Sequence, residues 1–151
     1  MLLSLLVLGG ALAGAAAAAE GPAAELEAAR ARWRAAALGD YEYGYRKFCE
    51  CHREAPPETL VTIRGGEVVR VRHRPQDYAL EVPAEDRNLQ YYWTMEGLFD
   101  LLESAIERGA TVRARYDATL GYPAELYIDY DAEFIGDELD LRLTRVERLS
   151  P

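Results

Sequence analysis

The sequence predicts an α+β protein, built on a single antiparallel β-sheet of about five to seven strands with two helices packed on it. Two segments, at about 23–38 and 94–108, carry apolar residues at helical spacing. The rest of the chain breaks into short stretches in which apolar and polar residues alternate. Because the links between these stretches are short, we expect antiparallel neighbours and a sheet that is covered by helices on one face.

The two predicted helices are an N-terminal and a central one. Residues 23–38 are rich in Ala, Glu and Arg, place Leu26, Ala29 and Trp33 on one stripe, and precede Gly39 as a stop signal. The central segment begins after Thr94, a good N-cap residue, and ends at Arg108-Gly109. Its apolar residues recur along one side of the helix: Leu98, Leu101, Leu102, Ala105 and Ile106.

Strands are predicted on both sides of the central helix. Tyr41, Tyr43 and Tyr45 alternate with polar or small residues, as in a half-buried strand. Gly65-Gly66 predicts a hairpin turn between strands at 59–64 and 67–74. In the second of these strands, strict alternation places Val69, Val71 and His73 on one face, and Val68, Arg70 and Arg72 on the other. We expect a further short strand at 78–82 and an irregular segment at 83–92.

Three more strands are predicted after the central helix, at 111–117, 125–131 and 139–146. In the last, Leu139, Leu141 and Leu143 point one way, and the residues between them point the other way: Asp140, Arg142 and Thr144. The sheet is therefore expected to be polar over part of one face.

The N-terminal run suggests export. Residues 1–19 are uncharged, begin with a Leu-rich core and end in Ala17-Ala18-Ala19 before Glu20. This pattern is typical of a secretory signal peptide with a cleavage site, which predicts residues 1–19 as a signal, residues 20–151 as one α+β domain, and a periplasmic or secreted location. The alternative is an uncleaved N-terminal membrane anchor.

The charge argues against a nucleic-acid partner. The formal net charge is −9, with residues 20–75 close to neutral and residues 76–151 strongly acidic. Binding to a phosphate backbone requires a basic face. The expected partner is therefore an envelope protein or a small ligand, whose identity the sequence leaves unknown.

Two cysteines lie one residue apart in Cys49-Glu50-Cys51-His52. In an oxidising compartment the favoured interpretation is a Cys49–Cys51 disulfide. In a regular strand their Cα atoms would be about 6.5 Å apart, so closure needs a bulge or a turn. Two alternatives stay open: a Cu(I) or zinc site formed by both thiolates with His52 or His73, and a thiol–disulfide redox role.

Gly121-Tyr122-Pro123 is the other conspicuous motif. It has a structural interpretation as a turn, since Gly supplies a positive φ and Pro presets the next one, and a functional interpretation as a candidate binding loop. No arrangement of nucleophile, base and acid is evident, and no phosphate-binding Gly-rich loop occurs. We therefore expect a non-enzymatic protein without a cofactor.

Several motifs together resemble a known family. They occur in this order: Tyr41-x-Tyr43, Cys49-x-Cys51, Gly66-x-Val68, Thr94 to Leu101, Tyr116-Asp117-x-x-x-Gly121-Tyr122-Pro123 and Ile128-Asp129. The set resembles small bacterial exported domains of unknown function, many of them lipoproteins, although no lipid-attachment cysteine follows the apolar run in this chain. The resemblance implies the fold and the compartment, and carries no activity with it.

Overall fold

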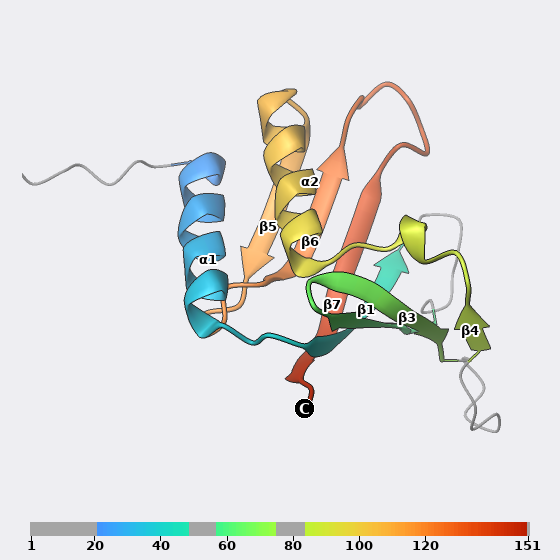
Figure 1. Cartoon of the computed structure of the whole chain (residues 1–151). Coiled ribbons are helices and arrows are strands. Elements are labelled where there is room, and N and C mark those ends of the chain that lie inside the picture. The colour runs from blue at the N-terminus through green and yellow to red at the C-terminus, as the bar shows by residue number, and fades with distance from the viewer. Residues whose placement is uncertain (1–20, 49–56, 75–83, 151) are drawn as a thin grey trace, which may run out of the picture.

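The computed structural model describes residues 21–48, 57–74 and 84–150 (Figure 1). The predicted fold class is confirmed: the chain forms one antiparallel sheet, an N-terminal helix and a central helix. In chain order the elements are α1 (Pro22–Ala36), β1 (Tyr41–Phe48), β2 (Thr59–Arg64), β3 (Glu67–His73), β4 (Ala84–Asp86), the 3-10 helix η1 (Leu89–Tyr91), α2 (Met95–Glu107), β5 (Thr111–Tyr116), β6 (Pro123–Asp129) and β7 (Leu139–Arg148).

The sheet has the strand order β4-β3-β2-β1-β7-β6-β5, and each pair of neighbours is antiparallel. The centre is therefore formed by β1 and β7, which lie at opposite ends of the described chain. The two helices pack against each other on one side of the sheet, where α1 contacts β5 and α2 contacts both β5 and β6 (Figure 1). The side of the sheet that faces away from α1 and α2 is called the outer face below.

The core between sheet and helices contains the tyrosines of β1. Tyr43 is fully buried and donates a hydrogen bond of 2.5 Å from its hydroxyl to the carbonyl of Trp93. The hydroxyl of Tyr41 accepts a hydrogen bond of 2.8 Å from the backbone N–H of Met95. Burial raises the pKa of Tyr41 and of Tyr45 to about 12. The hydroxyls of Tyr41 and Tyr43 thus hydrogen-bond the backbone at the start of α2 to the central strand β1.

The helix ends agree with their sequence signals in part. Thr94 caps α2 as predicted, because its Oγ1 accepts a hydrogen bond of 3.0 Å from the N–H of Gly97. The prediction that α1 runs to residue 38 and stops at Gly39 is wrong by two residues. The helix ends at Ala36, and Ala37 itself takes the left-handed conformation, with φ of 44°.

A buried arginine joins the two helices. Arg30 on α1 is 7% exposed, and its guanidinium lies 3.1 Å from a carboxylate oxygen of Asp100 and 3.1 Å from one of Glu103, both on α2. It also lies over the ring of Phe99, at 5.5 Å from the centroid. The two ion pairs and the ring contact offset the burial of this charge, while Nε has no hydrogen-bond partner among the described residues.

The predicted hairpin is present, but its faces differ from strict alternation. Gly65 and Gly66 both have positive φ, which suits the two-residue turn. The register shifts between Thr62 and Ile63, so that Ile63 lies opposite Val68. This β-bulge turns Val68 toward the core with Val71 and leaves Val69 45% exposed, which corrects the expectation that Val69 shares a face with Val71.

The other differences between the predicted and the observed elements are small. The last strand extends to Arg148, two residues beyond the prediction. The segment 83–92, expected to be irregular, contains β4 and η1. The short strand predicted at 78–82 lies outside the described residues. Within the described ranges, no helix has both the length and the apolar character needed to cross a membrane.

Candidate functional site

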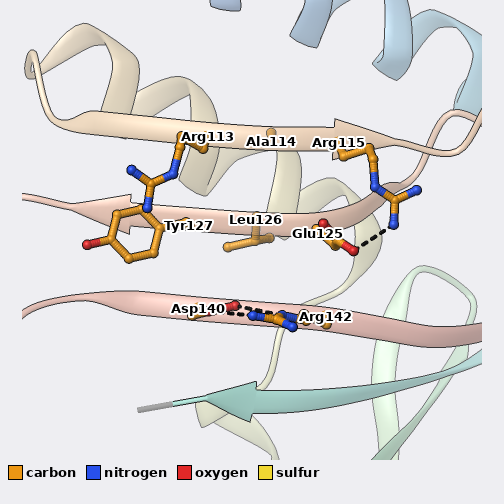
Figure 2. A pocket seen from close by; sticks show the side chains of 8 residues that line it. All are labelled: Arg113, Ala114, Arg115, Glu125, Leu126, Tyr127, Asp140 and Arg142. Atoms are coloured by element: carbon orange, nitrogen blue, oxygen red, sulfur yellow. Dashed lines mark hydrogen bonds and ion pairs between the residues drawn. The ribbon is translucent and has the colours of Figure 1, made fainter. Parts of the chain in front are cut away.

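The outer face carries a shallow hollow over strands β5, β6 and β7, with a volume of about 310 Å³ (Figure 2). Its side chains come from alternate positions of the three strands, which is why they share one face. The lining residues are Arg113, Ala114, Arg115, Glu125, Leu126, Tyr127, Asp140 and Arg142. The side chains of Ala114 and Leu126 pack toward the core on the other face, so these two residues contribute their backbone to the floor of the hollow.

Cross-strand pairs organise the polar side chains of the hollow. Arg113 on β5 lies opposite Tyr127 on β6, and its guanidinium carbon is 4.0 Å from the centre of the tyrosine ring. Arg115 lies opposite Glu125, with 2.7 Å between the guanidinium nitrogen and the carboxylate oxygen. Figure 2 shows both arginines reaching across from β5 to their partners on β6. These pairs set the orientation of the hollow's cations.

The third strand adds a further arginine. Arg142 on β7 is 3.3 Å from the carboxylate of Asp140, and its guanidinium carbon lies 4.2 Å from the ring centre of Phe48 on β1. Arg142 also lies opposite Glu125 in the strand register. Three guanidiniums and two carboxylates therefore line the hollow, in a protein whose net charge is −9.

The ion pairs of the hollow stay in contact with water. In the Arg115–Glu125 pair, the side chains are 66% and 49% exposed. The hydrogen bond from Arg115 lowers the pKa of Glu125, so this carboxylate is ionised at neutral pH. Arg113 has the ring of Tyr127 as its partner and forms no ion pair with any of the described residues. The hollow can therefore offer guanidinium groups to carboxylates of a bound partner.

A second polar cluster on the outer face lies over the centre of the sheet. Glu42 on β1 accepts hydrogen bonds from Arg72 at 2.6 Å, from Thr62 at 3.0 Å and from Arg145 at 3.1 Å. Its side chain is only 12% exposed. Burial by itself would raise the pKa of Glu42, but the hydrogen bonds from Arg72 and Thr62 outweigh it and lower the pKa. This carboxylate is saturated by its own sheet, which makes the cluster structural.

Close to that cluster, Gly44 makes room for a second carboxylate. Glu58 is 9% exposed and accepts a short hydrogen bond from the hydroxyl of Thr144 on β7. A Cβ atom on Gly44 would lie 2.5 Å from Thr144 Oγ1 and 2.7 Å from Glu58 Oε1. The missing side chain at Gly44 is therefore needed for this pair to form.

A third cluster surrounds His73 at the end of β3. Its Nδ1 lies 3.1 Å from Thr59 Oγ1, and its Nε2 lies 3.4 Å from Asp86 and 3.1 Å from the hydroxyl of Tyr92. Tyr92 also donates a hydrogen bond of 2.6 Å to Asp86, and this bond is the main reason that the pKa of Asp86 falls to about 2. Thr59 is buried, so the network offers no accessible nucleophile. It ties β4 and η1 to the end of β3.

The cysteine hypothesis falls outside the described residues. Cys49, Cys51 and His52 all lie in the segment that the structure does not describe, so the disulfide, the Cu(I) or zinc site and the redox role stay predictions. The other histidine considered for a metal, His73, contacts Thr59, Asp86 and Tyr92 as above. Over the described ranges, no group of three or more His, Cys, Asp or Glu side chains is arranged to hold a metal ion.

The turn at Gly121-Tyr122-Pro123 packs against α1. Gly121 has φ of 83°, and a Cβ there would lie 2.2 Å from the carbonyl oxygen of Ala29. Gly121 and Pro123 are buried, and Tyr122 is half-buried. The carbonyl of Tyr122 accepts a hydrogen bond of 2.8 Å from the N–H of Asp117, which closes the turn. These contacts agree with the structural interpretation of the motif, and its role as a binding loop stays a prediction.

Sequence reasoning did not single out the residues of the hollow as a site. The signal that could have found them is the period-2 alternation of the three strands. It places the two lining residues of each strand on one face: Arg113 and Arg115, Glu125 and Tyr127, and Asp140 and Arg142. It was recognised for the last strand alone, and the sequence does not show that this face lies beside Glu125 and Tyr127.

Comparison with known proteins gives a family and no function. The model of a family described as "Family of unknown function (DUF6174)" matches residues 25–148. No curated protein and no solved structure matches the chain. The match covers both helices and all seven strands of the sheet except for three residues at the start of α1.

Proposed function

Because the chain belongs to DUF6174, a family of unknown function, we propose its role from its geometry: an exported, non-enzymatic binding domain that recognises carboxylate groups of a partner in the hollow over β5–β7. The observation that carries the proposal is the exposed set of three arginines in an acidic protein. An acidic chain gains no solubility by gathering cations on one face, whereas a partner with carboxylates gains charge-assisted hydrogen bonds there.

The contacts within the hollow support binding over catalysis. The described residues that line it include no Ser, Thr, Cys or His, so within this part of the chain none of the usual nucleophiles or neutral-pH bases faces the space. The aromatic ring of Tyr127 contacts the guanidinium of Arg113 and orients it without neutralising its charge. A cation that is positioned by a ring, and that pairs with no carboxylate among the described residues, is suited to a ligand's carboxylate.

A selection experiment tests this proposal. A library of random 12-residue peptides is selected against the wild-type domain and against a double variant, Arg113→Gln with Arg142→Gln. We expect peptides rich in Asp and Glu to be enriched on the wild type and lost on the double variant. Arg32→Gln, which removes one exposed arginine from α1, is the matched control and should keep the enriched peptides. Enrichment that survives in the double variant, or no enrichment on the wild type, would exclude the hollow as the site.

The export and cysteine parts of the proposal depend on sequence signals. Residues 1–19 carry the signal-peptide pattern, and an oxidising compartment favours a disulfide between Cys49 and Cys51. Intact mass of protein recovered from the periplasm should correspond to a chain that begins at Glu20, with no thiol open to alkylation before reduction. Two alkylatable thiols would exclude the disulfide, and co-purifying zinc or copper would support the metal site in its place.

A further inference from the structure

Strand β5 forms one edge of the sheet and also lines the hollow. Its outward-facing backbone N–H and C=O groups have no hydrogen-bond partner among the described residues. In the part of the chain that the structure describes, β5 is the last strand of the sheet and pairs with β6 alone. Among the described residues, no backbone hydrogen bond joins β5 to any other segment. Every second residue of such an edge directs its N–H and C=O away from the sheet, where another strand can pair with them.

The inner side of β5 is incompletely covered. Val112, Ala114 and Tyr116 face the helices but are only half-buried, whereas the equivalent residues of β6, Leu126 and Ile128, are buried. The helix layer therefore covers the core over β6 and leaves apolar surface open at β5. A further strand beside β5 would cover this surface with its own inward side chains.

Space for those side chains exists between β5 and α1. A second hollow, of about 260 Å³, is lined by Pro22 and Glu25 of α1 together with Val112, Arg113, Ala114 and Tyr116 of β5. The first hollow lies on the outer face of the same strand, and both hollows include Arg113 and Ala114. The two spaces thus flank one strand edge, on opposite sides of the sheet.

From this arrangement we infer that the carboxylate-bearing partner is an extended peptide segment that pairs with β5 as an eighth strand. Its acidic side chains alternate with small or apolar ones: the acidic residues lie on the outer face beside Arg113 and Arg115, and the others enter the hollow between β5 and α1. This inference rests on the proposed function, because it names the partner of the same hollow.

Charge decides between this occupant and a second copy of the chain. In a full antiparallel pairing of two β5 strands that keeps their outer faces together, Arg113 lies opposite the partner's Arg113 or Arg115. Like charges directly opposite one another destabilise a strand pair. An acidic segment has the opposite charge at the same positions, so the arginines select a foreign strand over self-association.

The probe is a seven-residue peptide that alternates Glu and Val, with capped ends, and fluorescence polarisation measures its affinity. The double variant Arg113→Glu with Arg115→Glu should bind it about tenfold more weakly, and should bind a peptide that alternates Lys and Val about tenfold more tightly than the wild type does. Arg87→Glu, an exposed site near the opposite edge of the sheet, is the matched control and should change neither affinity. Circular dichroism checks that each variant is folded.

Backbone methylation separates strand pairing from simple charge attraction. One twin of the probe carries N-methyl groups on the Glu residues, and a second carries them on the Val residues. In a paired strand only one of the two sets of N–H groups faces β5, so one twin should lose binding and the other should keep it. Amide hydrogen exchange of β5 should slow on addition of the unmodified probe.

The outcomes distinguish a failure of strand addition from a failure of carboxylate recognition by the hollow. If both methylated twins bind as well as the unmodified probe and β5 exchange is unchanged, strand addition is wrong while carboxylate recognition by the hollow stands. If the unmodified probe and a scrambled acidic peptide both fail to bind, strand addition is wrong and the proposed function fails with it. Loss of one twin alone, together with reciprocal rescue by the Lys peptide, supports strand addition.

Discussion

Glu42 and Glu125 lie on the outer face of the same sheet, and each pairs with arginine, yet their surroundings differ. Glu42 is on a central strand, accepts three hydrogen bonds and is 12% exposed. Glu125 is one strand from the edge, has one ion pair among the described residues, with Arg115, and is 49% exposed. The centre of the face uses its charges to hold strands together, whereas the edge leaves its charges available to a partner.

The difference follows from position in the sheet. A side chain on β1 has strands on both sides, so arginines from β3 and β7 both reach Glu42. β5 has a neighbouring strand on one side, and among the described residues Arg113 contacts the ring of Tyr127 and no carboxylate. The same residue types therefore serve stability in one place and, in the proposed function, recognition in the other.

Neutralising each carboxylate in turn is the most direct test of whether Glu42 and Glu125 differ in their contribution to stability. Glu42→Gln should lower the free energy of unfolding by about 2 kcal/mol, because the half-buried Arg72 loses its carboxylate partner and Arg145 is left with its longer ion pair to Glu147, at 3.7 Å. Urea denaturation measures the change. The matched variant Glu125→Gln should leave the denaturation midpoint unchanged. Equal losses in the two variants would show that the two halves of the face do not differ.

Crowding the centre is expected to have the next largest effect. Gly44→Ala should cost about 1–2 kcal/mol of stability, since its Cβ would displace Thr144 and the buried carboxylate of Glu58 from their hydrogen bond. Thermal denaturation compares it with Gly97→Ala in α2, where the nearest side-chain atom to the new Cβ is 3.4 Å away. That control should be neutral or slightly stabilising. A neutral Gly44→Ala would mean that the Glu58–Thr144 pair contributes little.

Acid should weaken the centre of the face in a defined direction. The pKa of Glu42 is lowered in the folded protein, so its stabilising contribution is present above the unfolded value of 4.5 and is lost as pH falls below it. The stability difference between wild type and Glu42→Gln should therefore shrink as pH is lowered from 6 toward 3. A difference that stays constant with pH would contradict an ionised Glu42 in the folded state.

The smallest effect on stability is expected at the edge. Arg113→Gln should leave the urea midpoint unchanged, because this arginine forms no ion pair among the described residues, yet it should weaken binding of the acidic probe peptide. Arg72→Gln is the matched variant at the centre, and it should lower stability. If Arg113→Gln destabilises as much as Arg72→Gln, the edge arginine is structural too.

Local signals predicted much of the fold. The Gly65-Gly66 hairpin, the Thr94 cap and the tyrosine alternation of β1 each depend on a few adjacent residues, and each was predicted correctly. The bulge at Val69 was missed because Val68 and Val69 are equally apolar, and only pairing with β2 decides which of them faces the core. The end of α1 was misplaced because Ala37 takes a conformation that is usually left to Gly.

The candidate site was harder to predict, because it depends on contacts between distant parts of the chain. Glu42 and Arg145 are 103 residues apart in sequence, and their contact requires the β1–β7 pairing. The hollow likewise needs the registers of β5 on β6 and of β6 on β7 before Arg113, Tyr127 and Asp140 become neighbours. Alternation assigns each residue to a face of its own strand, but it does not order the strands.

That strand order also fixes when the sheet can be completed. Strands β1 to β4 form one continuous group and β5 with β6 another, and β7 alone lies between them. Without Leu139–Arg148, the two groups of described strands share no hydrogen-bonded strand pair. Contacts of such long sequence separation form slowly. The sheet therefore closes only when β7 takes its place between β1 and β6.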